Sequence, residues 1–339
     1  MATIKDVAKL AKVSIATVSR VINNPSSVSD ARTKLVKDAI EELHYVPNII
    51  AKELITKSSA TVGLLLPDIT NTFTPYIIDS FVKVLSDYHY NVVTCITGFD
   101  DKREQELIHV LTARNVCGFV FLGPRQAHSV NNPIISRLTD TFPVIMLDYF
   151  DDPKVCHVMA DEEEGAYLAA KHLIELGHRN IAFLNGDLSY GTYLHKQAGF
   201  LRAFEESGLT PDSSLMKSIT PDHIGGYQAT TELLQYRNRP TAIFTAGDQI
   251  AIGVYRAAQE NKVSIPSQLS VIGFSGSPFS LGLHPPLCTI SQFAPDIGRE
   301  AAMLMINLTK HKEEGVKDII INPALLDRFS CSYAAGHAV

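Results

Sequence analysis

The spacing of apolar side chains changes near residue 60 and divides the chain into two regions. Before that point, apolar residues recur every three or four positions, which is the period of an amphipathic helix. After it, short continuous apolar runs alternate with longer helical patterns, which is typical of parallel strands covered by helices. The 339-residue sequence therefore predicts a small helical segment followed by an α/β body.

Three short helices are predicted within the first 45 residues. Thr3 caps the first helix, and Ser14 caps the second, which runs from Ile15 to Asn23. The third helix runs from about Asp30 to Leu43. Its apolar face is predicted to consist of Ala31, Leu35, Val36, Ala39, Ile40 and Leu43. Two short helices joined by a tight turn and followed by a third helix form the helix-turn-helix layout.

In this layout the second helix enters the major groove of DNA. Arg20 lies on its outward side and can donate two hydrogen bonds to a guanine, while Ile15 and Ala16 can contact thymine methyl groups. Three hydroxyl groups suit phosphate oxygens: those of Ser14, Thr17 and Ser19. The first 60 residues carry nine basic and six acidic side chains in a chain of net charge −6. This local excess of positive charge favours a polyanionic partner.

Two short strings resemble the signatures of the LacI/GalR family of bacterial transcription regulators. They are VSIATVSRV at 13–21 and YVPN at 45–48, and the resemblance extends to the C-terminus. It implies a helix-turn-helix domain over 1–47, a hinge helix and linker over 48–60, and an effector-binding and dimerisation domain over 61–339. It also implies a homodimer that binds double-stranded DNA at a pseudo-palindromic operator.

The resemblance adds further DNA contacts to those on the second helix. Leu54 of each hinge helix would lever open the central base step in the minor groove. Lys52 stands where family members usually carry arginine. The added contacts implied by the family motif are Thr3, Asn24, Tyr45, Asn48, Ala51, Lys52 and Leu54.

Repeated strand–helix units in the second region predict two doubly wound parallel-sheet lobes of the periplasmic-binding-protein type. The predicted strands are Val62–Pro67, Val92–Thr97, Gly118–Gly123, Val144–Asp148, Ile181–Gly186, Ala242–Thr245, Val271–Phe274 and Ile319–Asn322. The predicted helices are 75–89, 102–115, 163–176, 195–207, 225–237, 248–261 and 296–311. The resemblance assigns about 61–160 and 293–321 to an N-lobe, and about 161–292 and 322–339 to a C-lobe.

Ligands in such sheets bind at the carboxyl ends of the strands, so the loops there should line an interlobe cleft. By resemblance, Lys196 stands where the family usually has an effector-gripping arginine, and Ser275 replaces a usual aspartate. Keeping a cation while losing that carboxylate favours a phosphorylated or acidic sugar, with a neutral sugar as the alternative. The effector contacts implied are Phe73, Tyr149, Tyr190, Thr192, Lys196, Asp248 and Ser275.

Motifs for catalysis, cofactors and metals are missing from the sequence. It contains no HExxH, CxxC, Walker A, GxSxG or GxGxxG string. The acidic run Asp161–Glu164 is predicted to be the first turn of a helix, favoured by the helix dipole, and not a metal site. Neither a signal-like segment nor a membrane-length apolar run is present, which predicts a cytoplasmic protein without a cofactor. The lack of a leucine heptad after Arg328 favours a dimer over a tetramer.

These patterns predict a DNA-binding repressor of carbohydrate uptake or catabolism genes, controlled by a sugar or sugar phosphate. Two alternatives stay open. A partner protein could control the regulator, although only scattered charges lie near Arg299 and Lys310. The chain could also be a cytosolic sugar sensor whose front segment is vestigial, in which case Arg20→Ala and Leu54→Ala would leave its function intact.

Overall fold

The computed structural model describes residues 2–23, 27–45, 59–310 and 315–334. The chain forms two compact units, residues 1–59 and 60–339. The predicted hinge-helix residues Asn48, Ala51, Lys52 and Leu54 lie outside the described residues, as does Asn24.

The first unit is a three-helix module with a small core. Its helices are α1 (Ile4–Leu10), α2 (Ile15–Asn23) and α3 (Asp30–Glu42). Their inward side chains form one cluster: Val7, Ala8, Ala11, Val18, Val21, Val36 and Ala39. The Asp6 carboxylate accepts hydrogen bonds from the backbone N–H and the hydroxyl of Thr3, at 2.8 and 2.7 Å. Ser14 Oγ accepts one from the N–H of Thr17 at 3.1 Å, so both predicted N-caps are confirmed.

The predicted apolar face of α3 was partly wrong. Leu35 is 53% exposed, and Ala31 is exposed as well. The other predicted positions are correct: Val36 and Ala39 are buried, and Ile40 and Leu43 pack against the core. Neighbouring positions on a helix are about 100° apart, so a residue directly before a buried one points sideways to the solvent.

The turn between α1 and α2 fixes the direction in which α2 leaves. Lys12 has a φ of 53°, in the left-handed region. The N–H of Val13 donates to the carbonyl of Ala8 at 3.0 Å, which is the bond of a Schellman ending. His44 ends α3 in the same way, with a φ of 46°. Neither position is glycine, so both carry some backbone strain.

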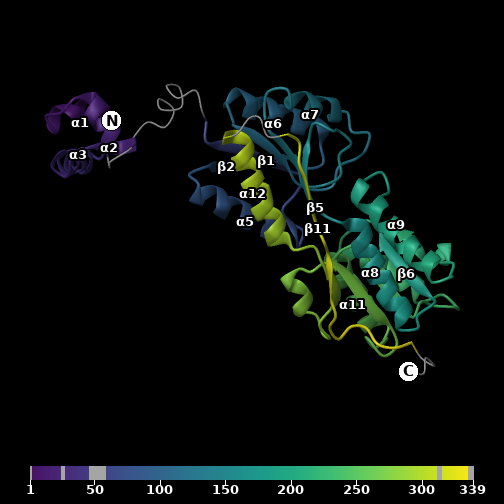
Figure 1. The fold of residues 1–339 in the computed structure, drawn as a ribbon. Helices are drawn as coiled ribbons and strands as arrows, with labels where there is room; N and C mark the ends of the chain where they lie inside the picture. The colour runs from purple at the N-terminus through teal and green to yellow at the C-terminus, as the bar shows by residue number, and fades with distance from the viewer. Residues whose placement is uncertain (1, 24–26, 46–58, 311–314, 335–339) are drawn as a thin grey trace. The chain divides into compact units, whose positions relative to one another are not determined.

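The second unit contains two six-stranded sheets, and each sheet with its helices is called a lobe here (Figure 1). The N-lobe sheet has the order β11-β5-β4-β3-β1-β2 and is parallel throughout. The C-lobe sheet has the order β12-β10-β9-β8-β6-β7, and only β12 is antiparallel to its neighbour.

Each lobe contributes six strands. In the N-lobe they are β1 (Thr61–Leu66), β2 (Asn91–Ile96), β3 (Gly118–Phe121), β4 (Val144–Met146), β5 (Cys156–Ala160) and β11 (Asp318–Ile321). In the C-lobe they are β6 (Ile181–Asn185), β7 (Met216–Ser218), β8 (Ala242–Thr245), β9 (Ser270–Ser275), β10 (Cys288–Ser291) and β12 (Ala324–Leu326).

Helices cover both faces of each sheet. Those of the N-lobe are α5 (Thr74–Asp87), α6 (Asp101–Ala113), α7 (Asn132–Leu138) and α12 (Ala294–Lys310). Those of the C-lobe are α8 (Glu162–Glu175), α9 (Gly191–Glu206), α10 (His223–Leu233) and α11 (Asp248–Glu260), with 3-10 turns η2 (Ser213–Leu215) and η3 (Pro278–Leu281). The pairs α5 with α12, α8 with α9, and α10 with α11 pack against each other. Among the described residues, no helix is long and apolar enough to cross a membrane.

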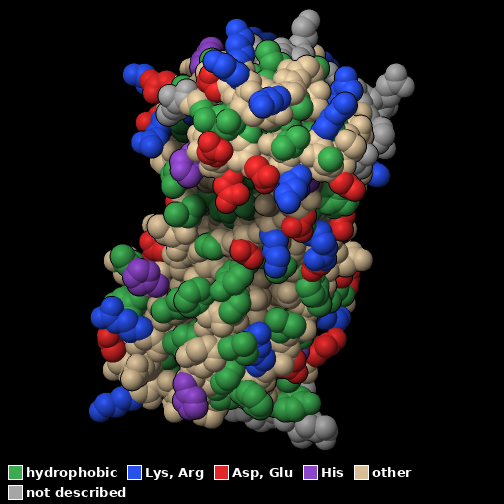
Figure 2. Space-filling view, turned by 90° about the vertical axis from the view of Figure 1, so that its left-hand side faces the viewer, with side chains coloured by type: hydrophobic (Ala, Val, Ile, Leu, Met, Phe, Trp, Pro, Cys, Tyr) green, Lys and Arg blue, Asp and Glu red, His purple; other side chains and the backbone are tan. Residues whose placement is uncertain are grey.

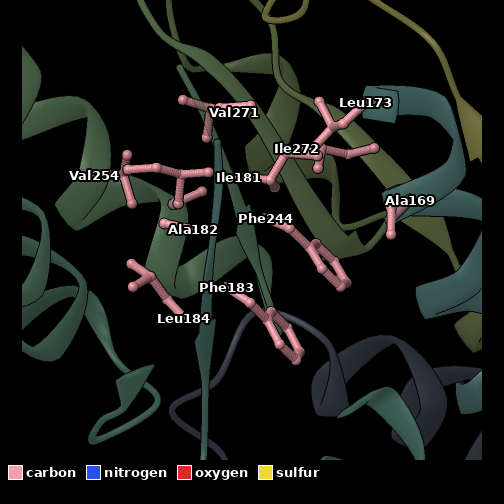
Figure 3. Close-up of a cluster of buried hydrophobic side chains, with 14 of the residues drawn as sticks. Ala169, Leu173, Ile181, Ala182, Phe183, Leu184, Phe244, Val254, Val271 and Ile272 are labelled. Carbon is pink, nitrogen blue, oxygen red and sulfur yellow. The ribbon is translucent and has the colours of Figure 1, made fainter. Parts of the chain in front are cut away.

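The C-lobe core explains why its sheet can be covered on both faces. Phe183 and Phe244 point to one side of the sheet, and Leu184 and Val254 lie on the other (Figure 3). The two rings stack with their centroids 4.7 Å apart. Burial on both faces is typical of parallel sheets. The doubly wound prediction is confirmed.

The chain passes between the lobes three times. β5 ends the first pass through the N-lobe at Ala160, and α8 then begins in the C-lobe. The chain returns between β10 and α12, near Gln292, and passes again between β11 and β12. These three crossing segments are the covalent connections between the lobes.

All eight predicted strands and all seven predicted helices of the body are present, each within four residues of its predicted bounds. Four strands and one helix were not predicted: β5, β7, β10, β12 and α7. Helix α9 begins at Gly191, four residues before its predicted start. Thr192 and Lys196 therefore lie one turn apart on the same helix, and not in a loop.

Candidate functional site

Helix α2 presents the side chains that were predicted to read DNA. Ile15 is 45% exposed, and Ala16 and Arg20 are exposed too, whereas Val18 and Val21 on the opposite side are buried. Burial of one side fixes the helix on the module and leaves the other side available for contact.

The remaining predicted DNA contacts of this unit differ in their exposure. Ser14 and Thr3 are exposed, and Thr17 and Ser19 are half-buried. The hydroxyls of Ser14 and Thr17 are 2.9 Å apart and hydrogen-bonded to each other, so both also serve the N-cap of α2. Tyr45 is half-buried and packs against the three-helix core.

The described basic side chains of this unit lie at its surface. All of its described basic residues are exposed: Lys5, Lys9, Lys12, Arg20, Arg32, Lys34 and Lys37. Exposed cations suit the phosphates of a nucleic acid, because each contact releases condensed counterions.

A cavity of about 110 Å³ opens at the carboxyl ends of β1, β2 and β3, where the sheet topology predicted a ligand. Its walls include Pro67, Thr97 and Arg125 from the N-lobe and Tyr190 from the C-lobe. Tyr190 and Gln126 form an isolated bridge across the two lobes. The cavity is therefore interlobe, and of the predicted effector contacts Tyr190 belongs to it.

Arg125 is a site residue that the sequence interpretation missed. Its guanidinium is paired with the carboxylate of Glu104 and lies over the ring of Phe121. Asn131 donates a hydrogen bond to the second oxygen of Glu104 at 2.8 Å. The only sequence signal for Arg125 is its position in the loop that follows a strand.

Lys196 is buried, as expected of an effector-gripping cation, but it already has a partner. Its Nζ lies 3.0 Å from Glu162 Oε2, donates to Thr192 Oγ1 at 3.1 Å, and lies 4.3 Å from the centroid of the Phe274 ring. The other oxygen of Glu162 accepts a hydrogen bond from Gln292 Nε2 at 2.8 Å. Lys196 is therefore bound directly to Glu162 at one interlobe pass and, through Glu162, is linked to Gln292 at another.

Close packing of α8 and α9 makes this ion pair possible. A Cβ at Gly199 would lie 2.0 Å from the carbonyl oxygen of Glu163, so no larger residue fits there. The glycine lets α9 approach the start of α8, and thereby brings Lys196 to Glu162.

Asp148 is a second group that the sequence interpretation did not include among the effector contacts. Burial and the nearby Glu162 carboxylate raise its pKa to about 7, while the N–H of Tyr149 and the charges of Lys196 and Arg125 oppose the shift. Asp148, which follows β4, is therefore close enough to both cations to feel their charge. A carboxyl group with a pKa near neutrality can donate or accept a hydrogen bond.

Tyr149 contacts the opposite lobe. Its ring stacks on His195 of α9, with the centroids 3.8 Å apart, and its backbone N–H donates to Asp148 Oδ1 at 2.7 Å. It lines a second interlobe cavity of about 310 Å³, together with Arg202. Burial raises the pKa of the Tyr149 hydroxyl.

Asp248 and Ser275 lie together at the carboxyl ends of β8 and β9. The Asp248 carboxylate accepts hydrogen bonds from Thr289 Oγ1 at 2.6 Å and from the N–H of Ser277 at 2.7 Å. Burial raises its pKa to about 6, and these hydrogen bonds oppose the shift. Ser275 has a φ of 117°, which brings strain to the end of β9.

Phe73 is half-buried at the N-cap of α5 and packs against the N-lobe core. Of the predicted effector contacts, Tyr190 and Tyr149 line the two interlobe cavities. The others do not: Phe73, Thr192, Lys196, Asp248 and Ser275.

The acidic run Asp161–Glu164 forms the first turn of α8, as predicted. Asp161 Oδ1 accepts a hydrogen bond from the N–H of Glu164 at 2.9 Å, and Glu163 and Glu164 both pair with Arg202. Within the described part of the chain, no group of His, Cys, Asp and Glu side chains could hold a metal ion.

Comparison with known proteins matches both units of the chain. The model for bacterial regulatory proteins of the lacI family matches residues 3–48, and that for a periplasmic binding protein-like domain matches residues 170–331. The HTH-type transcriptional regulator DegA of Bacillus subtilis is 33% identical over 97% of this chain and 98% of its own. The ribose operon repressor of Haemophilus influenzae is 30% identical over the same shares of the two chains.

Solved structures agree with these relatives. The crystal structure of the Lac repressor dimer bound to operator and the anti-inducer ONPF has a TM-score of 0.88 and 26% identity, covering 98% of this chain and 99% of that one. The likeness extends over the helix-turn-helix unit and both lobes. This chain belongs to the lacI family of bacterial regulatory proteins, which are DNA-binding transcription regulators.

Proposed function

We propose that the chain forms a homodimer that represses carbohydrate genes, reads an operator through α2 and releases or retains it in response to a sugar. The observation that carries the DNA-reading role is the division of α2 into a buried and an exposed side, with Arg20 on the exposed one. The ribose operon repressor and the Lac repressor–operator complex among its relatives support the same function.

Selection from a random DNA duplex library tests the DNA-reading role. The expected result is an enriched pseudo-palindrome, because two copies of α2 in a symmetric dimer read two half-sites. Selection that enriches no sequence over many rounds would contradict it and would favour the vestigial-segment alternative. The Arg20→Ala variant in the same selection identifies which base of the half-site this residue reads.

An apolar patch on the C-lobe supports dimerisation. Four hydrophobic side chains of α10, α11 and η3 are exposed: Ile224 at 54%, Ile252 at 37%, Phe279 at 60% and Leu281 at 59%. Helices α10 and α11 pack together, and Tyr255 of α11 donates to the carbonyl of Pro285 near η3, at 2.8 Å. Figure 2 shows hydrophobic side chains over the lower part of its face, where the C-lobe lies. Apolar patches of this kind mark association surfaces.

A sugar effector is supported by the cleft. The interlobe cavity, the buried Lys196 and the stacked Tyr149 and His195 all lie where the chain passes between lobes or where the lobes touch. A ligand that binds there would change the relative stability of open and closed lobes, with a coupling of about 1–3 kcal/mol to DNA binding. Titration of a sugar panel into the repressor–operator complex, followed by fluorescence anisotropy, tests this. A panel that never changes operator affinity would contradict it.

Control by a partner protein has less support. Arg299 is paired with Asp296, and Lys310 Nζ lies 5.2 Å from the centroid of the Tyr88 ring. Both of the cations singled out for that alternative already have intramolecular contacts.

A further inference from the structure

The interlobe cleft buries positive and negative charge in a defined arrangement. Lys196 and Arg125 are the cations, and Glu162, Glu104 and Asp148 are the acids. All three acids are less than 10% exposed. Each cation is paired with one acid, and Asp148 lies near both pairs. The cleft therefore has no surplus of positive charge with which to attract an anion.

Glu162 is held in place from two sides. Its Oε1 accepts the hydrogen bond from Gln292, and its Oε2 lies 3.0 Å from the ammonium of Lys196. Oε2 is buried, and the Lys196 ammonium is its one partner among the described residues. Asn185 Oδ1, at the carboxyl end of β6, is a buried acceptor with no donor in the same part of the chain. Buried acceptors without donors are costly unless a ligand or water supplies the missing hydrogen bonds.

We propose that Glu162 determines the charge of the effector, so that the cleft accepts neutral polyhydroxy ligands and rejects anionic ones. This inference rests on the proposed function, because it requires that an effector binds near Lys196. A ligand hydroxyl can donate to Glu162 Oε2 and accept from Lys196 at the same time. A phosphate or carboxylate brings a negative charge and would face two buried acids, Glu162 and Asp148.

The sequence alone pointed to the opposite ligand class. It showed Lys196 as a retained cation and Ser275 in place of a carboxylate, which favours a phosphorylated or acidic sugar. In the folded chain the missing negative charge is supplied by Glu162, from a different helix. Glu162 acts on the ligand directly through Oε2 and indirectly by neutralising Lys196.

The test compares Glu162→Gln with a matched control, Glu163→Gln, in the full-length dimer. Glu163 lies in the same first turn of α8, but it pairs with Arg202 and not with Lys196. Inorganic phosphate and a panel of neutral pentoses, hexoses and disaccharides are titrated by calorimetry at constant ionic strength. Glutamine keeps the acceptor for Gln292 and removes only the charge. Glu162→Gln should therefore bind phosphate at least tenfold more tightly than the wild type, and Glu163→Gln should bind it no better.

The double variant Glu162→Gln/Lys196→Gln should lose the gained phosphate affinity, which assigns that affinity to the freed ammonium. Equal phosphate affinity in the wild type and Glu162→Gln would overturn the proposal. If Glu162→Gln does not fold, the wild type decides: phosphate binding that Lys196→Gln abolishes would overturn the proposal, and binding of neutral sugars alone would support it.

Failure of the proposed function gives a different result. If no neutral sugar binds the wild type but Glu162→Gln gains phosphate affinity, the sugar effector is wrong and the role of Glu162 stands. If neutral sugars bind the wild type and phosphate binds it equally well, the effector cleft stands and the role of Glu162 is wrong.

Discussion

The three-helix unit and the interlobe cleft handle positive charge in opposite ways. Every described Lys and Arg of the three-helix unit is exposed, Arg20 among them. The cleft instead buries Lys196 and Arg125 and gives each a carboxylate partner. Exposed charges attract a polyanion, and salt screens them. Buried ion pairs are screened little, and a ligand group can take the place of one partner only if its charge suits the other.

The two units are therefore suited to different kinds of ligand: exposed cations suit a polyanion, and rigidly held buried groups suit a small molecule. Affinity for DNA needs many exposed cations and few base contacts. Discrimination among small ligands needs few groups that are held rigidly, as Glu162 is by Gln292 and Lys196.

Breaking the buried pair should have the largest effect on folding. Lys196→Gln leaves the buried charge of Glu162 without its partner, so the free energy of unfolding should fall by about 3–5 kcal/mol. Urea denaturation of the unliganded protein measures it. The control is Lys154→Gln, because Lys154 pairs with Asp140 with both side chains more than 60% exposed, and no measurable change is expected. Equal effects of the two variants would remove the distinction between buried and exposed charge.

The raised pKa of Asp148 should make stability depend on pH. Its pKa rises from 3.8 to about 7 on folding, so its contribution is complete below pH 3.8 and is lost as pH rises through 7. Asp148→Asn abolishes this loss. Between pH 5 and pH 8 the wild type should lose about 2 kcal/mol of stability relative to the variant. Parallel pH profiles for the two proteins would show that Asp148 is not buried as described.

Arg20→Ala should relax the base preference at one position of each half-site by about 1–3 kcal/mol. The reason is the loss of the bidentate contact that the Arg20 guanidinium can make to guanine. Anisotropy titrations with single-base operator variants measure it. Lys102→Ala, an exposed substitution on α6, serves as the control and should leave the preference unchanged. An Arg20→Ala variant with undiminished base preference would exclude the contact.

His44→Gly should stabilise the three-helix unit slightly. His44 ends α3 with a φ of 46°, a conformation that costs a non-glycine residue about 1 kcal/mol. Part of the gain is offset because glycine has more freedom in the unfolded chain. The free energy of unfolding of α1–α3, measured by hydrogen exchange of their amides, should therefore increase by less than about 1 kcal/mol in His44→Gly. It should not increase in His44→Ala.

Most of the fold was predictable because the apolar patterns that identify its strands and helices are local in the sequence. Runs such as Val62–Leu66 and Ala242–Thr245 are continuous apolar strands, and both were identified. β7, with the sequence MKS, and β12, with the sequence ALL, have three residues each and show no pattern of their own. They are strands only because a sheet edge is present beside them, and that edge is formed by distant parts of the chain.

The sequence predicted which loops would line the effector cleft but not how the charged side chains there are paired. The loops after the strands and the position of Lys196 followed from the topology and the family resemblance. The pairing of Lys196 with Glu162 did not, because the two residues are 34 positions apart and meet only where Gly199 lets α8 and α9 approach. Arg125 and Glu104 meet in the same way, from a loop and a helix. Such partners decide the net charge of the cleft, which is why the sequence suggested an anionic ligand.

The salt dependence of both binding reactions tests the central comparison most directly. The affinity for the selected operator and for the tightest neutral sugar of the panel is measured from 50 to 200 mM salt. Operator affinity should fall about a thousandfold or more, because the exposed cations displace counterions from several phosphates. Sugar affinity should stay constant, because the buried pairs are already neutral. An operator affinity that does not change with salt, or a sugar affinity that falls steeply, would contradict the account.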